Sequence, residues 1–242
     1  MGRGRGRARR GASGAPPPRP PGRTAPPPSV GLIVRRLQRT YGRRPWKTWG
    51  PPLAELVATI LSQNTNDRNS SFALERLREA FPTWEAVADA RVGPIAAAIR
   101  PAGLHRQKAR SIRAALRAIR QDRGRLSLDF LRRRPTDWAR RYLLALPGVG
   151  PKTAACVLCF SLRRPVLPVD THVHRTSRRL GLLHGRTSAE KAHEVLGALV
   201  PPDLTYTFHV LLIEHGRRTC RARRPDCPAC PLRDVCPSAY RA

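Results

Sequence analysis

One lysine stands in a position where its type matters. Lys152 follows two glycines in LPGVGPKTA, residues 146–154, in a chain where only four of the 46 basic residues are lysine. Arginine keeps its proton in proteins, whereas a lysine near other positive charge or in a dry pocket can become a neutral amine nucleophile. Chance is the other explanation for this single residue. Lys152 is therefore a candidate for covalent chemistry that other features of the chain must support.

Four of the six cysteines form a compact group near the C-terminal end, with the spacing Cys220-x6-Cys227-x2-Cys230-x5-Cys236. In an intracellular chain such a group is more typical of a metal site than of two disulfides. Four thiolates can bind one zinc ion or a [4Fe-4S] cluster, and the spacing alone leaves both open. The other pair, Cys156 and Cys159, lies in the apolar segment AACVLCFSL and is expected to be buried.

The charge of the chain points to a polyanionic partner. The formal net charge is +30 and the isoelectric point is about 11.8. Nucleic acid is the first candidate, since each phosphate that an arginine neutralises releases condensed counterions, and a membrane surface is the competing one. No apolar run of about 18 residues and no signal-peptide core occur. We therefore expect an intracellular, nucleic-acid-associated protein without a membrane role.

The first 28 residues differ from the rest. Residues 1–28 consist almost entirely of Arg, Gly, Pro and Ala, and no acidic residue occurs before Glu55. Such a composition lacks the apolar side chains that a core requires. We expect residues 1–28 to be a disordered basic tail that acts as an electrostatic tether.

From Val30 onward, apolar residues recur at helical spacing, with short Gly and Pro breaks between the segments. This pattern predicts an all-α bundle. The predicted helices are LAELVATILSQ, SFALERLREAF, TWEAVADA, GPIAAAIR, QKARSIRAALRAIRQ, DFLRRRPTDWARRYLLAL, PKTAACVLCFSL and SAEKAHEVLGALV. Five apolar positions are predicted to lie in the core: Phe72, Leu74, Leu77, Trp84 and Val87.

Three motifs occur in a specific order: LPGVGPKTA, then VLPVDTHVHR, then the four cysteines. In this order the chain resembles bacterial endonuclease III, a base-excision DNA glycosylase of the helix-hairpin-helix superfamily with an iron-sulfur loop. The resemblance covers residues 30–238. It implies a [4Fe-4S] cluster on the four cysteines, with a structural or DNA-sensing role.

The resemblance also implies a fold. The family has two helical domains with a DNA-binding groove between them. Residues 45–164 would form the six-helix domain that ends in the hairpin, and residues 29–44 together with 165–242 would form the cluster domain.

Within the hairpin, the two glycines are expected to turn the chain tightly and to expose successive N–H groups to a DNA phosphate. The expected phosphate-binding residues are Gly148, Val149, Gly150 and Thr153. An ordinary interhelical turn is the alternative for a bare GxG, but the Lys-Thr-Ala that follows and the basic chain favour the DNA hairpin.

By the same resemblance, Lys152 matches the family's nucleophile and Asp170 its essential carboxylate. The amine would attack C1′ of the damaged nucleotide, and Asp170 would stabilise positive charge on the sugar. Asp170 is also a candidate N-cap for the helix that begins at THVHR. His172 is a candidate pocket residue.

The damaged nucleotide must leave the stack, so other residues must fill the gap. In the family these residues come from two turns, which here contain Gln63, Asn64 and Leu104. Asn64 aligns with the usual glutamine, and Gln63 precedes it, so either is a candidate polar wedge. Leu104 is the candidate apolar wedge.

The resemblance therefore implies a bifunctional DNA N-glycosylase and abasic-site lyase that removes oxidised pyrimidines. Its partner would be double-stranded DNA with damaged bases or abasic sites, bound by a monomer in the bacterial cytoplasm, at the nucleoid. Two alternatives stay open at this point: a monofunctional mismatch glycosylase of the same superfamily, and a non-catalytic helix-hairpin-helix module. The mismatch glycosylase typically lacks lysine at this position, and the module gives no reason for both Lys152 and Asp170.

Overall fold

The computed structural model describes residues 26–239. Most of the predicted basic tail, residues 1–28, lies outside this range. Of its last three residues, Pro26 and Pro27 are exposed and Pro28 is buried.

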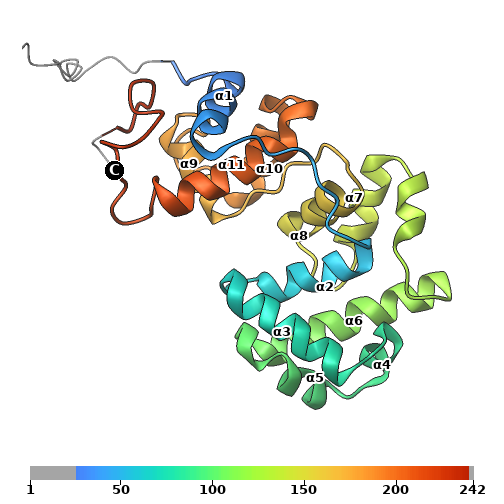
Figure 1. The fold of residues 1–242 in the computed structure, drawn as a ribbon. Coiled ribbons are helices and arrows are strands. Elements are labelled where there is room, and N and C mark those ends of the chain that lie inside the picture. Colours follow the sequence, from blue (N-terminus) through green and yellow to red (C-terminus); the bar gives the residue numbers. More distant parts are fainter. Residues whose placement is uncertain (1–25, 240–242) are drawn as a thin grey trace, which may run out of the picture.

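All regular structure in residues 26–239 is helical, as predicted. Figure 1 shows two lobes. The helices of one lobe are α2 (Pro52–Ser62), α3 (Asp67–Ala80), α4 (Trp84–Asp89), α5 (Val92–Ala98), α6 (His105–Arg123), α7 (Thr136–Leu144) and α8 (Pro151–Cys156). Those of the other lobe are α1 (Val30–Tyr41), α9 (Thr171–Arg179), α10 (Ala189–Leu199) and α11 (Thr205–Arg218). Short segments complete them: the 3-10 turns η1 (Arg100–Ala102), η2 (Asp129–Arg133) and η4 (Pro202–Leu204), and the π-helical turn η3 (Val157–Ser161).

Each lobe has its own apolar core. Residues between 53 and 162 form the larger cluster, and residues 30–41 join residues between 167 and 232 in the second. The chain therefore leaves the lobe of α1, builds the other lobe, and returns after η3 (Figure 1).

Aromatic side chains join the segment after α1 to both lobes. Trp49 stacks on Phe160 with ring centroids 4.1 Å apart, and Trp46 stacks on Tyr206 at 5.7 Å. The indole N–H of Trp46 also donates to the carbonyl of Cys159 at 3.0 Å. These contacts hold the segment between α1 and α2 against η3, the π-helical turn that continues α8.

Short polar side chains mark the beginning of five of the α-helices in residues 26–239. Each accepts a hydrogen bond from a backbone N–H three residues ahead, which satisfies a donor that the helix itself leaves unpaired. The capping residues are Ser29, Asn66, Thr83, Asp170 and Ser188. The expectation that Asp170 caps a helix is thereby confirmed.

The predicted continuous helix DFLRRRPTDWARRYLLAL is wrong. Pro135 divides it into η2 and α7. Proline has no N–H to donate and disfavours helical backbone in the residue before it, and Arg134 is extended, with φ −102° and ψ 151°.

The core prediction holds for Leu77 and Val87, which are fully buried. Leu74 and Trp84 are only partly buried, and Phe72 is wrong, because it is 50 % exposed on α3. Helix α11 was absent from the predicted set, although Phe208, Leu211 and Leu212 fill the second core.

Among residues 26–239, no single helix is both long and apolar enough to cross a bilayer. The bent pair Ala189–Leu199 and Pro202–Arg218 passes the same test by length and composition only, with a bend of 119°.

Candidate active site

Lys152 lies in the first turn of α8, where Pro151 begins the helix. Its side chain is half-buried, and Nζ donates a hydrogen bond to Ser62 Oγ at the end of α2, 3.4 Å away. The amine is therefore held between two helix ends while it keeps access to solvent.

Asp170 precedes α9, and its Oδ1 accepts the backbone N–H of Val173 at 2.7 Å. This contact fixes the carboxylate, because the side chain cannot rotate without leaving the helix uncapped. Asp170 is half-buried, in the segment that returns from the lobe of α8 to the lobe of α9.

Two buried groups interact with both Lys152 and Asp170. Burial lowers the pKa of His209 to about 4, while the charge of Asp170 raises it and that of Lys152 lowers it further. Burial raises the pKa of the Cys156 thiol to about 12, against the opposing charge of Lys152 and with smaller contributions from other groups, including Asp170. The charges of Lys152 and Asp170 thus both affect the pKa values of His209 and Cys156, although the two residues come from different lobes.

His209 also supports the segment that carries Asp170. Its Nδ1 lies 2.8 Å from the carbonyl of Pro168, so this nitrogen carries the proton and donates. The bond anchors the chain two residues before Asp170. Since His209 is 3 % exposed, the neutral imidazole is the form that fits this position.

Glu55 provides a second carboxyl group, which is buried and whose charge interacts with that of Lys152. It is 9 % exposed on α2, and its Oε1 accepts a hydrogen bond from Thr59 Oγ1 at 3.1 Å. Burial raises the pKa of Glu55 to about 7, and this rise is opposed by the Thr59 hydrogen bond and by the charge of Lys152.

The hairpin needs glycine at one of its two positions. Gly148 has φ 76°, and a Cβ there would lie 2.5 Å from Ser111 Cβ on α6. Gly150, by contrast, has extended backbone with φ −96°, and a Cβ added to it would meet no atom within 4 Å, so the fold itself does not require glycine there. The prediction that both glycines serve the turn is therefore corrected for Gly150.

The hairpin leaves several backbone donors open. Val149 donates its N–H to the Leu146 carbonyl at 3.2 Å and is itself buried. Within residues 26–239, the N–H groups of Gly148, Gly150, Lys152 and Thr153 donate no hydrogen bond. An anion at this turn would meet these donors and the N-terminal end of a helix.

The two predicted wedge turns differ in how free their side chains are. Gln63 is half-buried, and its Nε2 donates to Thr153 Oγ1 at 3.2 Å and to the Gly148 carbonyl at 3.4 Å. Asn64 is exposed and has left-handed backbone with φ 51°. Leu104 is 52 % exposed and also left-handed, with φ 45°. Asn64 and Leu104 thus expose their side chains to solvent, whereas the side chain of Gln63 is hydrogen-bonded to the hairpin.

His172, the candidate pocket residue, lies in the first turn of α9. Arg175 Nη2 donates to its Nδ1 at 3.2 Å, and Gly216 of α11 packs against it. Burial lowers the pKa of His172, and the charges of Arg175 and Arg217 add to this effect. His172 therefore joins α9 to α11.

All four C-terminal cysteines line one hollow beside α9 and α11. Two donors point at their sulfurs: the Leu232 N–H lies 3.4 Å from Cys230 Sγ, and Arg179 Nη1 lies 3.4 Å from Cys220 Sγ. Such donors stabilise thiolates that bind a metal centre. Among the described residues, no three His, Cys, Asp or Glu side chains converge as the ligands of a single ion do.

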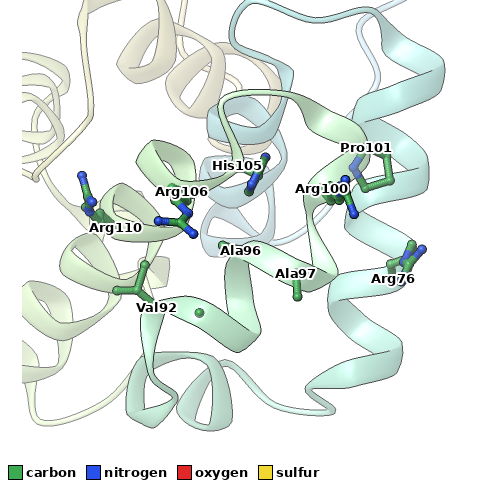
Figure 2. A pocket seen from close by; sticks show the side chains of 10 residues that line it. Arg76, Val92, Ala96, Ala97, Arg100, Pro101, His105, Arg106 and Arg110 are labelled. Carbon is green, nitrogen blue, oxygen red and sulfur yellow. The ribbon is translucent and has the colours of Figure 1, made fainter.

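An arginine-lined groove lies next to Leu104. Its volume is about 830 Å³, and α3, α5, η1 and α6 form its walls. Figure 2 shows Arg106 and Arg110 on one side and Arg76 and Arg100 on the other, with alanines between them. No acidic side chain lines the groove, and within residues 26–239 none of these four arginines forms an ion pair.

Comparison with known proteins identifies the family. Residues 57–202 match the model of the HhH-GPD superfamily of base excision DNA repair proteins. Endonuclease III of Thermotoga maritima is 36 % identical over 204 residues, which cover 84 % of this chain and 90 % of that protein. The chain belongs to the endonuclease III family.

Further endonuclease III proteins are similar to this chain over most of its length. The endonuclease III of Sulfolobus acidocaldarius is 35 % identical over 76 % of this chain and 80 % of its own. The solved structure of a non-covalent endonuclease III–DNA complex superposes with a TM-score of 0.73 at 30 % identity, over 86 % of this chain and 93 % of that chain. This endonuclease III family member is a DNA glycosylase of base excision repair.

Sequence reasoning missed several buried ionisable residues of this family member, among them Glu55, Lys108 and His209. A signal for each was present. Glu55 and His209 interrupt otherwise apolar helical runs, and the rarity of lysine that marked Lys152 applies equally to Lys108.

Proposed function

We propose that this glycosylase is bifunctional, with Lys152 as the nucleophile and an abasic-site lyase step after base removal. The observation that supports this proposal is the half-buried amine of Lys152 at the start of α8, with the fixed carboxylate of Asp170 acting on the same buried surroundings. A non-catalytic DNA-binding module would need neither group.

In the proposed reaction, the neutral amine of Lys152 attacks C1′ of the damaged nucleotide. The N–C1′ bond forms as the glycosidic bond breaks, and the base leaves with that electron pair and takes up a proton. Asp170 stabilises the positive charge that develops on the sugar and takes part in proton movement. One oxygen of Asp170 is occupied by the Val173 N–H, so the carboxylate is held in place for this role.

The lyase step follows from the product of the first. Opening of the sugar ring gives an imine between Lys152 and C1′, which makes the C2′ proton acidic. Loss of that proton moves its electron pair towards C3′, and the C3′–O bond breaks with the phosphate as leaving group. Arginine at position 152 would keep the charge but could not form the imine.

We propose DNA with oxidised pyrimidines or abasic sites as the substrate. The open N–H groups of the hairpin would bind a phosphate near the lesion, because backbone donors bind phosphate without reading base sequence. Asn64 and Leu104 would enter the gap that the extruded nucleotide leaves. Binding by one monomer in the bacterial cytoplasm, at the nucleoid, completes this proposal.

We propose a [4Fe-4S] cluster on Cys220, Cys227, Cys230 and Cys236. Their common hollow and the donors directed at two of the sulfurs support it. Four thiolates around one hollow could hold a [4Fe-4S] cluster or one zinc ion, and membership of the endonuclease III family favours the cluster. When bound, the cluster would cross-link the C-terminal loop, and no reaction step requires it.

Strand cleavage on a panel of lesion duplexes tests the proposed function. We expect cleavage at an oxidised pyrimidine and at an abasic site without added alkali. Base release that gives strand breaks only after alkali would show a monofunctional glycosylase, and binding without base release would show a non-catalytic module.

A further inference from the structure

Lys108 is a buried lysine whose partners are not carboxylates. It lies on α6 with 2 % of its surface exposed, and burial lowers the pKa of its amine. Nζ donates to the carbonyl of Leu61 and to the carbonyl of Ala102, each at 2.7 Å. Burying an ammonium group is costly, so these two bonds must offset a penalty that an apolar side chain would not incur.

The two carbonyls belong to the two wedge turns. Leu61 lies in the last turn of α2, three residues before Asn64, and Ala102 ends η1, two residues before Leu104. Carbonyls at the ends of helices lack partners within the helix and carry partial negative charge, which makes them good acceptors for a lysine.

Both turns then pass through left-handed backbone at a residue that is not glycine. Asn64 has φ 51° and Leu104 has φ 45°. Such conformations persist only where the surroundings enforce them, and they concentrate at functional sites. One ammonium group thus anchors both strained turns at their bases.

We infer that Lys108 is a positioning residue that sets the spacing between the Asn64 turn and the Leu104 turn, so that both side chains enter the duplex together. This inference rests on the proposed function, because it assigns Asn64 and Leu104 as the residues that fill the gap. Lys108 does not contact the reacting atoms.

The test uses Lys108→Met, which keeps the length of the side chain and removes its donors. Lys191→Met, at an exposed lysine of α10, is the matched control. Cleavage is measured on an oxidised pyrimidine in a fully paired duplex and on the same lesion in an unpaired bubble, where no stacked gap has to be filled. We expect the variant to lose on the order of 10-fold to 100-fold on the duplex and much less in the bubble. Equal losses on both substrates would show a general structural role and overturn the inference.

A second measurement covers the case in which Lys108→Met does not fold. Asn64→Ala, Leu104→Ala and the double variant are compared for cleavage of the paired duplex, with Lys108 intact. Coupled turns predict effects that do not add, whereas independent turns predict additive effects and contradict the inference. Failure of the wild-type chain to cleave any lesion would instead refute the proposed function.

A separate observation concerns the arginine groove. Arg76, Arg100, Arg106 and Arg110 are all exposed, and the groove begins directly after Leu104 (Figure 2). We propose that this groove binds backbone phosphates of the DNA beyond the wedge. Its lining without acids and its guanidinium groups outside any ion pair of residues 26–239 fit the repeated charges of a sugar-phosphate backbone.

Binding of undamaged duplex at several salt concentrations tests the groove. Arg106→Gln combined with Arg110→Gln should reduce the slope of log K against log salt by about 0.9 for each phosphate that is no longer neutralised. Arg125→Gln, an exposed change beyond the C-terminal end of α6, should leave the slope unchanged. An unchanged slope in the double variant would place the groove away from the DNA.

Discussion

Thr59 donates a hydrogen bond to the buried carboxyl of Glu55, one helical turn away on α2 and near the amine of Lys152. These two residues are the polar interruption in the apolar run of residues 53–61 that packs into the first core. Their burial has a consequence for stability that depends on pH.

Glu55 should make the folded state less stable as pH rises. Burial raises its pKa to about 7 from an ordinary value of 4.5, so between these two values the folded state holds a proton that the unfolded state has released. The cost grows from pH 4.5 to pH 7 and then stays constant, at on the order of 3 kcal/mol. Glu55→Gln should therefore raise the free energy of unfolding at pH 8 more than at pH 5, as measured by chemical denaturation.

The exposed change Glu79→Gln is the control, and it should show no such difference. If Glu55→Gln alters stability equally at both pH values, the carboxyl does not titrate in this range.

The two hairpin glycines should respond differently to alanine. Gly148→Ala should destabilise the fold, because it combines a left-handed backbone with a 2.5 Å approach to Ser111 Cβ. Gly150→Ala should leave the melting temperature nearly unchanged and weaken DNA binding, since its Cβ would occupy the open side of the turn. Thermal melts and duplex titrations check both variants, and wild-type affinity in Gly150→Ala would argue against a phosphate at this turn.

Alanine substitutions at the neighbouring residues Gln63 and Asn64 should also have different effects. Asn64→Ala should slow cleavage of a paired lesion with only a modest loss of stability, because the side chain is exposed but alanine adopts left-handed backbone less readily than asparagine. Gln63→Ala should lower stability, because it removes two hydrogen bonds to the hairpin. Single-turnover kinetics and melts distinguish them; a reversed pattern would make Gln63 the wedge.

The cluster proposal predicts a yellow-brown protein that contains about four irons per chain. Cys230→Ser should lose colour and iron, whereas Cys159→Ser, at the fully buried thiol on η3, should keep both. Metal analysis of protein purified without oxygen decides the matter, and stoichiometric zinc without iron would contradict the assignment.

Features that depend on local pattern were predictable from the sequence. Helical periodicity and capping residues such as Asp170 act over a few residues, so the all-α fold and this cap could be foreseen. Phe72 was placed in the core because composition favours burial, yet only the packing of α3 decides which of its faces meets α2. The two bonds of Lys108 reach residues 47 and 6 positions away, and no local pattern encodes that meeting.

Borohydride trapping on DNA that contains an abasic site tests the nucleophilic role of Lys152 most directly. The wild-type chain should form a covalent complex through the imine of Lys152. Lys152→Arg should bind the same DNA, since charge is preserved, but should give no trapped complex and no base release. Lys191→Arg, at the exposed lysine paired with Glu194, should be trapped like the wild type. Trapping and cleavage by Lys152→Arg at the wild-type rate would show that this amine is not the nucleophile.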